Sequence, residues 1–461
     1  MADNTRSGET LSAEACVVDE LLPESSLPSL ESAGTLTIPK RRWRIAWLLG
    51  LGVLVNYFDR VNLSVSHGAL TTTFGISDIT FGYLLGAYNW TYALCQLPIG
   101  VVLDKFGVRR VGRISTLLWS IATFGAAMTP SVGGFFVARL LLGVGESPTF
   151  PANAKAIGCW FPPQERSFAT SLFDAAAKFA SAIGVPLIGI LLLHVGWRLS
   201  FMATGLISLF YFVLFLRMYR DPEEDAALSA AEFEYIRAQR ESAPDAIVAQ
   251  RASLGYLLRQ RKVIGLALGF GSYNYVFYLL LAWLPSYLSE SLHIDLLHSF
   301  VYTGVPWLIA TATDLLVGGW LVDALIRRGW NANRVRLTVL VGGTALGLGI
   351  LGAGLSHSSM QALAWISLSI GGLAAAAPVG WSIPSLIAPR SCVGTVGGIL
   401  NLSNQISGIA APIVTGYLVH AQHSFTMAFA VAGAYLVLGI CGYLFLLGNI
   451  CPIAAESAAL A

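Results

Sequence analysis

The feature that most constrains this chain is a series of long apolar segments. A helix needs about 20 mainly apolar residues to cross the roughly 30 Å hydrocarbon core of a bilayer. Twelve segments of about that length follow one another, at residues 44–66, 80–103, 111–129, 133–157, 168–194, 197–217, 263–288, 299–325, 335–355, 361–386, 394–420 and 424–448. Because a helix satisfies its own backbone hydrogen bonds in lipid, the pattern predicts an all-α membrane protein with twelve transmembrane helices.

The composition supports a membrane environment. Only 12% of the 461 residues are charged, whereas soluble domains have roughly 25%. The formal net charge is only +2, so nothing in the charge balance indicates a nucleic-acid partner. The lipid bilayer is therefore the large partner that we expect, and we expect a monomer within it.

Polar stretches divide the chain into five parts. We expect an acidic, disordered tail (residues 1–40), a first six-helix bundle (41–217), a cytoplasmic connector of mixed charge (218–262), a second six-helix bundle (263–448) and a short C-terminal tail (449–461).

The basic residues predict the orientation. All but four of the 28 Lys and Arg residues lie on the N-terminal tail or on connections that share its side of the membrane. The exceptions are Arg60, Arg139 and Lys178, which lie within apolar segments, and Arg198. Because cytoplasmic loops are enriched in Lys and Arg, we expect both termini to be cytoplasmic and the chain to lie in the inner (cytoplasmic) membrane.

The two halves of the chain repeat a short pattern. Gly100-x-x-x-Asp104 follows the second segment, and Gly319-x-x-x-Asp323 follows the eighth. An arginine pair comes next in each half. Parallel half-repeats of six segments predict two pseudo-symmetric bundles that rock around a binding site near the middle of the membrane.

Seven ionisable residues lie within the apolar segments: Asp59, Arg60, Arg139, Glu146, Asp174, Lys178 and Asp314. Each costs roughly 2.5–3.5 kcal/mol at the membrane centre, so these side chains should face one another or a watery cavity. Arg139 and Glu146 are seven residues apart, about two helical turns, and can therefore line one cavity. Asp59 and Arg60 diverge by about 100° on their helix, so each needs a partner of its own.

Several motifs carry a resemblance to a known family. GVVLDKFGVRR (100–110) resembles the cytoplasmic-loop signature of the major facilitator superfamily. NYFDRVNLS (56–64), RLLLGVGESPTFPAN (139–153), WFPPQER (160–166) and GGILNLSNQ (397–405) resemble its anion:cation symporter branch, especially bacterial sugar-acid/proton symporters of the galactonate and hexuronate type. The resemblance covers residues 41–448. It implies proton-coupled symport of a small organic anion by alternating access, without a cofactor or a metal.

The resemblance also implies roles for particular residues. Those that match Asp59 and Glu146 carry protons, and those that match Arg60 and Arg139 balance their charge and attract the anion. The loop residues resemble the family's inner gate, which pairs with a neighbouring helix end when the site is open outward. The residues matched to the sugar-acid pocket are Tyr57, Tyr92, Trp381 and Asn401, and those matched to the gate are Asp104, Lys105, Arg109 and Arg110.

One position departs from this pattern. Galactonate-type members carry a pocket glutamine where this chain has Ala177, between Asp174 and Lys178. These two charged residues are four apart and can form an intrahelical pair. If Lys178 instead faces the cavity, it offers a cation for a second carboxylate or another anionic group. Asp314 resembles the hexuronate type, and a structural role for it stays open.

Other interpretations remain open. The intramembrane charges can be fixed ion pairs that only hold the fold. The chain can be an exchanger of organic anions, an aromatic carboxylate transporter of the same superfamily, or a receptor that binds without transporting. An enzyme is not expected, because GxSxG and HExxH are absent and no histidine lies deep in a segment.

Overall fold

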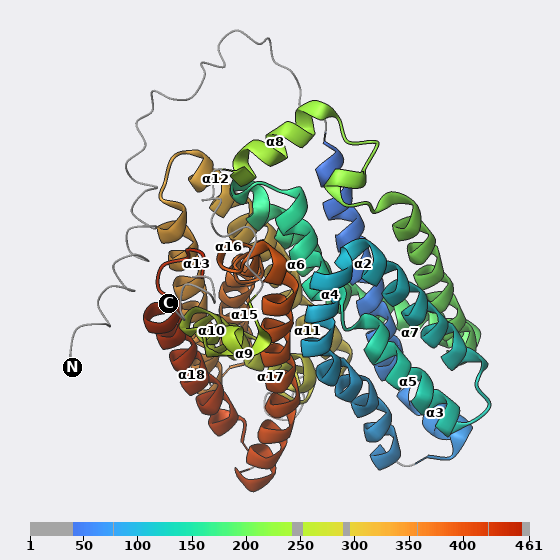
Figure 1. Cartoon of the computed structure of the whole chain (residues 1–461). Helices are drawn as coiled ribbons and strands as arrows, with labels where there is room; N and C mark the ends of the chain where they lie inside the picture. The colour runs from blue at the N-terminus through green and yellow to red at the C-terminus, as the bar shows by residue number, and fades with distance from the viewer. Residues whose placement is uncertain are drawn as a thin grey trace.

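Figure 1 shows the computed structural model, which describes residues 40–76, 78–241, 252–288, 296–356, 358–422 and 424–453. These residues are almost entirely helical, and none of them forms a strand. The predicted acidic tail, apart from Lys40, and residues 454–461 lie outside the described residues. The predicted all-α fold is confirmed.

The first half of the chain crosses the molecule six times. Its elements are α2 (Arg41–Val65), α3 (His67–Phe74), α4 (Asp78–Met128), α5 (Val132–Glu146), α6 (Thr149–Trp160), the short turn η4 (Pro163–Glu165) and α7 (Arg166–Met218). The helices α4 and α7 each contain two crossings. They reverse direction at Gly107 and Gly196, whose φ angles of 77° and 75° are readily adopted by glycine alone.

The second half repeats this plan. Its elements are α10 (Arg261–Ser286), α11 (Leu296–Thr313), the π-helix η8 (Asp314–Leu321), α12 (Val322–Arg327), α13 (Ala332–Gly347), α14 (Gly349–Gly354), α15 (Ser359–Ser382), α16 (Pro384–Ile387), η9 (Arg390–Cys392), α17 (Val393–Gln422), α18 (Thr426–Cys441) and the π-helix η10 (Gly442–Leu447). Where two or three elements follow one another without reversing, they form one crossing. Judged by length and composition, seven helices among the described residues can span a membrane.

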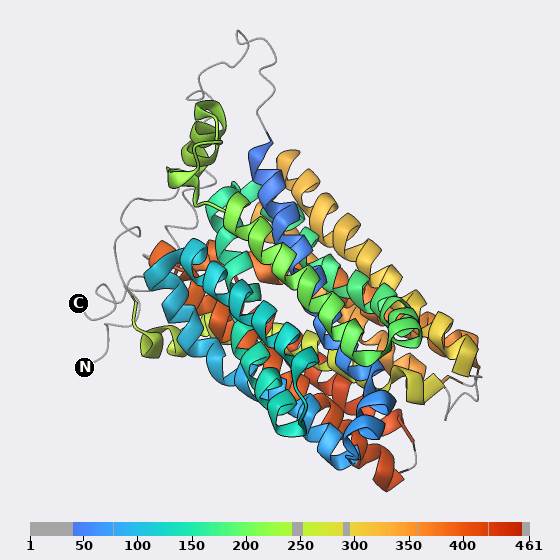
Figure 2. The same ribbon diagram turned by 90° about the vertical axis from the view of Figure 1, so that its right-hand side faces the viewer.

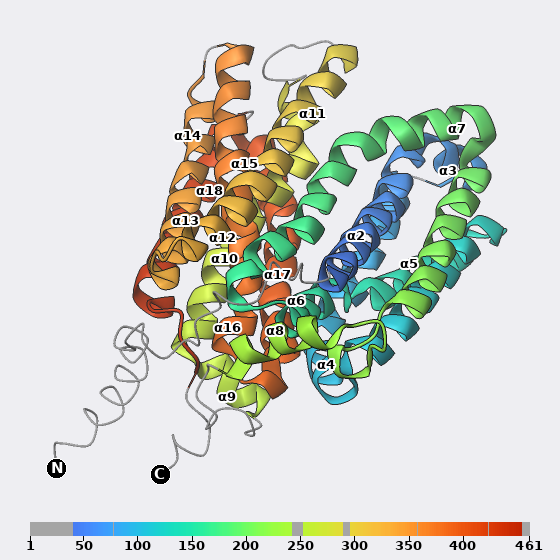
Figure 3. The same cartoon turned by 90° about the horizontal axis from the view of Figure 1, so that it is seen from above.

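The crossings form two bundles. The first half, blue to green, lies on the right of Figure 1, and the second half, yellow to red, lies on the left. The helices run side by side along one direction (Figure 2). Seen from above, the bundles stand beside each other, with α6 and α17 where they meet (Figure 3). The predicted pair of six-helix bundles is therefore confirmed.

The connector is held to both bundles: ion pairs tie its first part to the first bundle, and α9 (Leu254–Arg259) packs against the second. It also contains η5 (Pro222–Glu224) and α8 (Ala230–Glu241). Arg42, at the start of α2, forms buried ion pairs with Glu165 (2.7 Å) and Glu232 (3.0 Å), and Arg41 pairs with Asp225 (2.9 Å). We call the end of the bundles on which these elements lie the connector end, and the opposite one the far end.

Candidate functional site

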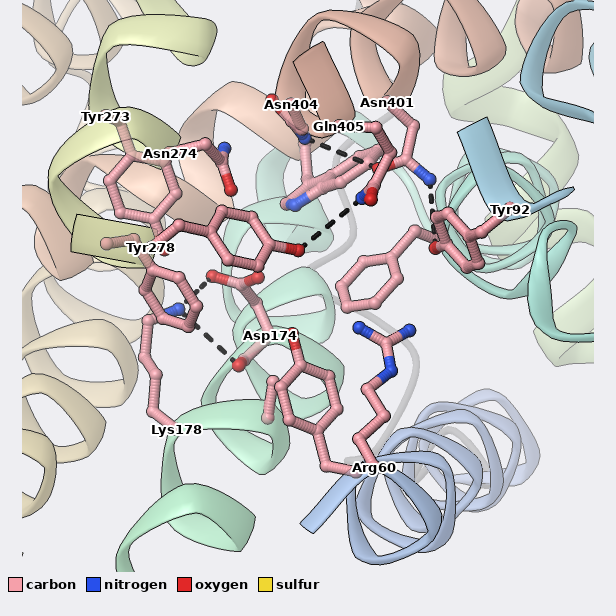
Figure 4. A pocket seen from close by; sticks show the side chains of 15 residues that line it. Arg60, Tyr92, Asp174, Lys178, Tyr273, Asn274, Tyr278, Asn401, Asn404 and Gln405 are labelled. Carbon is pink, nitrogen blue, oxygen red and sulfur yellow. Dashed lines mark hydrogen bonds and ion pairs between the residues drawn. The ribbon is translucent and has the colours of Figure 1, made fainter. Parts of the chain in front are cut away.

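A polar cavity lies between the two bundles. The space between its side chains is narrow in this state, and polar and aromatic side chains make up its wall. Seven helices from both bundles contribute to its wall (Figure 4). The lining residues are Tyr57, Arg60, Tyr92, Phe150, Asp174, Ala177, Lys178, Tyr273, Asn274, Phe277, Tyr278, Trp381, Asn401, Asn404 and Gln405.

Arg60 is the cation on the α2 side of the cavity. Its Nε lies 3.3 Å from Oε2 of Glu146, which is completely buried. Three tyrosine rings surround the guanidinium, with centroids 4.6 Å (Tyr57), 4.9 Å (Tyr88) and 5.2 Å (Tyr92) from its central carbon. Aromatic faces attract a cation, and this attraction grows when water is excluded. The site thus keeps a charged guanidinium at the cavity wall.

The other predicted charges of the first bundle lie behind that wall. Asp59 is 1% exposed and accepts hydrogen bonds from the hydroxyls of Thr123 and Ser208, both 3.0 Å from Oδ2. Arg139 is 3% exposed, and its guanidinium lies 5.4 Å from the ring of Tyr88. Arg139 and Glu146 are not among the residues that line the cavity in this structure, because Arg60 and the tyrosines occupy that side of it.

Lys178 lies in the opposite part of the wall, within a buried cluster. Its Nζ is 2.5 Å from Oδ2 of Asp174, one turn earlier on α7, and 2.7 Å from Oδ2 of Asp314 on η8. All three side chains are almost fully buried. Both arrangements considered from the sequence therefore occur together: Lys178 forms the intrahelical pair and also faces the cavity. The pair with Asp314, which links the two bundles, was not predicted.

Neutral polar and aromatic groups complete the wall. The amide of Asn401 donates to the hydroxyl of Tyr92 (3.1 Å) and to Oε1 of Gln96 (3.0 Å), which joins α17 to α4. The ring of Trp381 stacks on Phe150, with centroids 5.2 Å apart. The structure thus brings together the four residues matched to the pocket, Tyr57, Tyr92, Trp381 and Asn401.

Sequence reasoning missed part of the wall. The missed residues are Phe150, Tyr273, Asn274, Phe277, Tyr278, Asn404 and Gln405, and the missed ring beside Arg60 is Tyr88. Signals for them were present. Tyr88 precedes Tyr92 by one turn, the aromatic run SYNYVFY (272–278) is unusually polar for a core helix, and Asn404 and Gln405 fall within the motif that contains Asn401.

The predicted gate residues separate into two groups. Asp104 reaches the second bundle, where it accepts hydrogen bonds from the backbone N–H groups of Gly394 (2.9 Å) and Thr395 (2.7 Å) at the start of α17. It also pairs with Lys155 (2.6 Å), which was not predicted. Lys105 and Arg110 are exposed, and Arg109 pairs with Glu224 of the connector. Of the four, Asp104 is the residue with described contacts across the interface.

The second half contains the counterpart of this contact. Asp323 accepts hydrogen bonds from the backbone N–H groups of Ser167 (3.2 Å) and Phe168 (2.8 Å) at the start of α7. Nearby, a guanidinium nitrogen of Arg336 donates to the carbonyl oxygen of Pro163 (2.6 Å). Between described residues, the hydrogen bonds and ion pairs that join the bundles lie either at the cavity or toward the connector end.

Fold and cavity together define a class of protein: a twelve-helix membrane transporter whose two bundles enclose a polar site. Residues 49–412 match the Major Facilitator Superfamily, and the chain belongs to this family. It is similar to the uncharacterized transporter YybO of Bacillus subtilis (39% identity, covering 89% of this chain and 94% of YybO). It is also similar to the probable galactarate/D-glucarate transporter GarP of Escherichia coli (31%, covering 89% and 95%).

The fold has a solved counterpart. The proton:xylose symporter XylE superimposes with a TM-score of 0.73 over 91% of this chain and 99% of XylE, at 16% identity. This likeness concerns the fold alone. The resemblance to sugar-acid transporters of the superfamily, predicted from the sequence motifs, is confirmed by the curated relatives.

Proposed function

We propose that this transporter imports a small organic anion, a sugar acid or a related carboxylate, together with protons. The observation that carries the proposal is the position of Arg60: a guanidinium at the cavity wall, paired with the buried carboxylate of Glu146. An anion that reaches Arg60 competes with Glu146 for it, and a proton on Glu146 removes that competition. The sugar-acid substrates named for GarP agree with this chemistry.

The proposed cycle uses both buried carboxylates of the first bundle. Asp59 and Glu146 take up protons, the anion binds at Arg60 with Arg139 nearby as a balancing charge, and the bundles then rock so that the other end opens. Tyr57, Tyr92, Trp381 and Asn401 would contact the hydroxylated carbon chain. No organic cofactor or metal takes part, no chemical step is needed, and the carrier acts as a monomer.

The same proposal assigns the sides of the membrane. The connector end is cytoplasmic, as are both termini, and the protein lies in the inner membrane. Among the described residues, the hydrogen bonds and ion pairs between the bundles lie at the cavity and toward the connector end, which supports assigning the structure to a state closed on the cytoplasmic side. Asp104 serves as the inner gate, with Lys105, Arg109 and Arg110 as charges of the same loop.

Uptake into proteoliposomes tests the proposal. With an inward-directed proton gradient, the purified protein should accumulate at least one anion from a panel of aldonates, uronates, aldarates and aromatic acids. Asp59→Asn and Glu146→Gln keep the size of the side chain but remove a proton site, so accumulation should fall at least about tenfold in each. Glu234→Gln, on the exposed face of α8, is the matched control and should accumulate normally.

The alternatives give different outcomes. Exchange of internal for external anion with no response to the proton gradient would identify an exchanger. Binding without uptake would identify a receptor, and uptake of aromatic acids alone would exclude sugar acids. Normal accumulation by both carboxylate variants would show that Asp59 and Glu146 do not couple protons.

A further inference from the structure

We propose that Asp174, Lys178 and Asp314, here named the Lys178 cluster, form a second anion subsite, so that the cavity takes an organic anion with an acidic group at each end. The inference rests on the function proposed above and specifies its substrate class as a dicarboxylate.

The cavity has two separate cations in its wall. Arg60 enters from α2 and Lys178 from α7, and Figure 4 shows them on different sides of the space. Among the described lining residues they are the only basic side chains. Neutral groups suited to a hydroxylated chain also line the wall, such as the hydroxyl of Tyr278, 3.5 Å from the amide of Gln405. A monocarboxylate needs one of these cations, whereas a dicarboxylate can use both.

The charge of the Lys178 cluster makes this subsite dependent on protons. With all three groups ionised, two carboxylates share one ammonium at 2.5 and 2.7 Å, and the net charge is −1. An incoming carboxylate is then repelled. One proton makes the cluster neutral, and it leaves the ammonium with a single carboxylate partner. The ammonium of Lys178 can then donate hydrogen bonds to the distal carboxylate of the substrate. A proton therefore binds to the cluster together with this carboxylate.

The proton has a defined destination. The cluster's other titratable neighbours are the phenols of Tyr57 on α2 and Tyr273 on α10, whose ring centroid lies 5.9 Å from Lys178 Nζ. Phenols are neutral near pH 7 and do not take up a proton there. The lining residues from α6, α15 and α17 are uncharged. Asp174 and Asp314 are therefore the groups of this region that can bind the extra proton.

Substrate binding at the Lys178 cluster would also change an ion pair that holds the two bundles together. Of the ion pairs between described residues, Lys178–Asp314 is the one that joins the first bundle to the second. A distal carboxylate that replaces Asp314 at Lys178 breaks this link while it occupies the cavity. Binding thus changes the relative stability of the two arrangements of the bundles, which a substrate must do to drive a conformational change. A fixed structural pair would not need a cavity-facing lysine with two competing carboxylates.

Calorimetric binding to the purified full chain tests this subsite. The probes are an aldarate and the aldonate of the same carbon length, each measured between pH 5.5 and 7.5 in buffers of different ionisation enthalpy, at about 25 °C. We expect the aldarate to bind at least about tenfold more tightly, with about one more proton taken up per molecule bound than for the aldonate.

Two variants make the result specific. The double variant Lys178→Gln/Asp314→Asn removes opposite charges together and so keeps the net charge. It should bind the aldarate and the aldonate with similar affinities, mainly because the aldarate binds more weakly. It should also no longer take up the extra proton on binding the aldarate. Lys262→Gln, at the connector end, changes a lysine outside the cavity wall and should keep both.

The outcomes separate the two proposals. If the wild-type protein binds neither probe and transports no sugar acid, the proposed function fails. If it binds both probes equally, or if the double variant keeps the preference, the second subsite is wrong while anion transport stands. If the double variant loses the preference for the aldarate but takes up as many protons as the wild type, the proposed proton dependence of the subsite is wrong.

Discussion

At the scale of single residues, Arg60 shows how a buried cation is held ready for a ligand. The ion pair with Glu146 uses its Nε, and the rings of Tyr57, Tyr88 and Tyr92 flank the guanidinium. Its Nη2 is buried without a hydrogen-bond partner. A buried donor left unpaired costs roughly 1–3 kcal/mol, which a ligand carboxylate can recover. Within the described surroundings, the guanidinium is thus held in place but incompletely paired.

Arg60→Lys should weaken anion binding at least about tenfold, or about 1.4 kcal/mol, although the charge stays the same. Lysine is a compact point charge that cannot form two parallel hydrogen bonds to a carboxylate and fits a ring of aromatic faces less well. Titration of the transported anion against the purified variant measures the change. Arg44→Lys, on the exposed face of the same helix, is the control. Equal affinities for wild type and Arg60→Lys would show that the anion does not bind the guanidinium.

At the scale of elements, each bundle supplies a carboxylate to the start of a helix in the other bundle. Asp104 binds the first N–H groups of α17, and Asp323 those of α7. These N–H groups have no partner within their own helix, and the helix dipole favours a negative charge there. Gly100 makes the approach possible, since a Cβ at that position would lie 2.8 Å from the carbonyl oxygen of Gly394.

Asp323→Asn should open the connector end, because the amide loses the charge that the helix start favours. A loss of about 1–2 kcal/mol shifts the populations of closed and open states about 5–30-fold. Distances between spin labels at the exposed positions Arg110 and Arg328 would report the open population. Asp104→Asn should act alike, whereas Asp221→Asn, a connector carboxylate that contacts Tyr219, should not. Unchanged distances in both interface variants would contradict the gate.

At the scale of the whole molecule, the connector stabilises one end. Arg41 and Arg42 tie it to the first helix, and Arg109 ties it to the turn at Gly107. Only the first bundle takes part in these ion pairs. The part of the connector that contains η5 and α8 can therefore move with the first bundle when the two halves rock, whereas α9 packs against α10 and α17 of the second bundle.

Cysteine labelling tests the proposed orientation. In a chain whose six native cysteines are replaced, Glu234→Cys in α8 should resist a membrane-impermeant thiol reagent in intact cells, because the positive-inside rule places the connector in the cytoplasm. Thr72→Cys, an exposed residue of α3 at the far end, should react. Both sites should react after the membrane is permeabilised, which controls for accessibility. The opposite pattern in intact cells would reverse the orientation.

The sequence by itself determined the fold class and much of the site. Twelve apolar segments permit few arrangements in lipid, and a charge within such a segment is costly enough to mark a functional candidate. Family motifs then indicated residues such as Tyr57 and Asn401, which the structure places in one cavity wall. These predictions depend on local composition and spacing, which a sequence contains directly.

Only the tertiary structure decided which charges meet. The pairing of Lys178 with Asp314 joins residues 136 positions apart, and Asp59 turned toward Thr123 and Ser208 instead of the cavity. Arg139 lies behind the wall of the cavity, although its spacing from Glu146 would allow both residues to line it. Helical periodicity fixes the face of a helix that bears a residue, but the neighbour on that face depends on how the bundles pack.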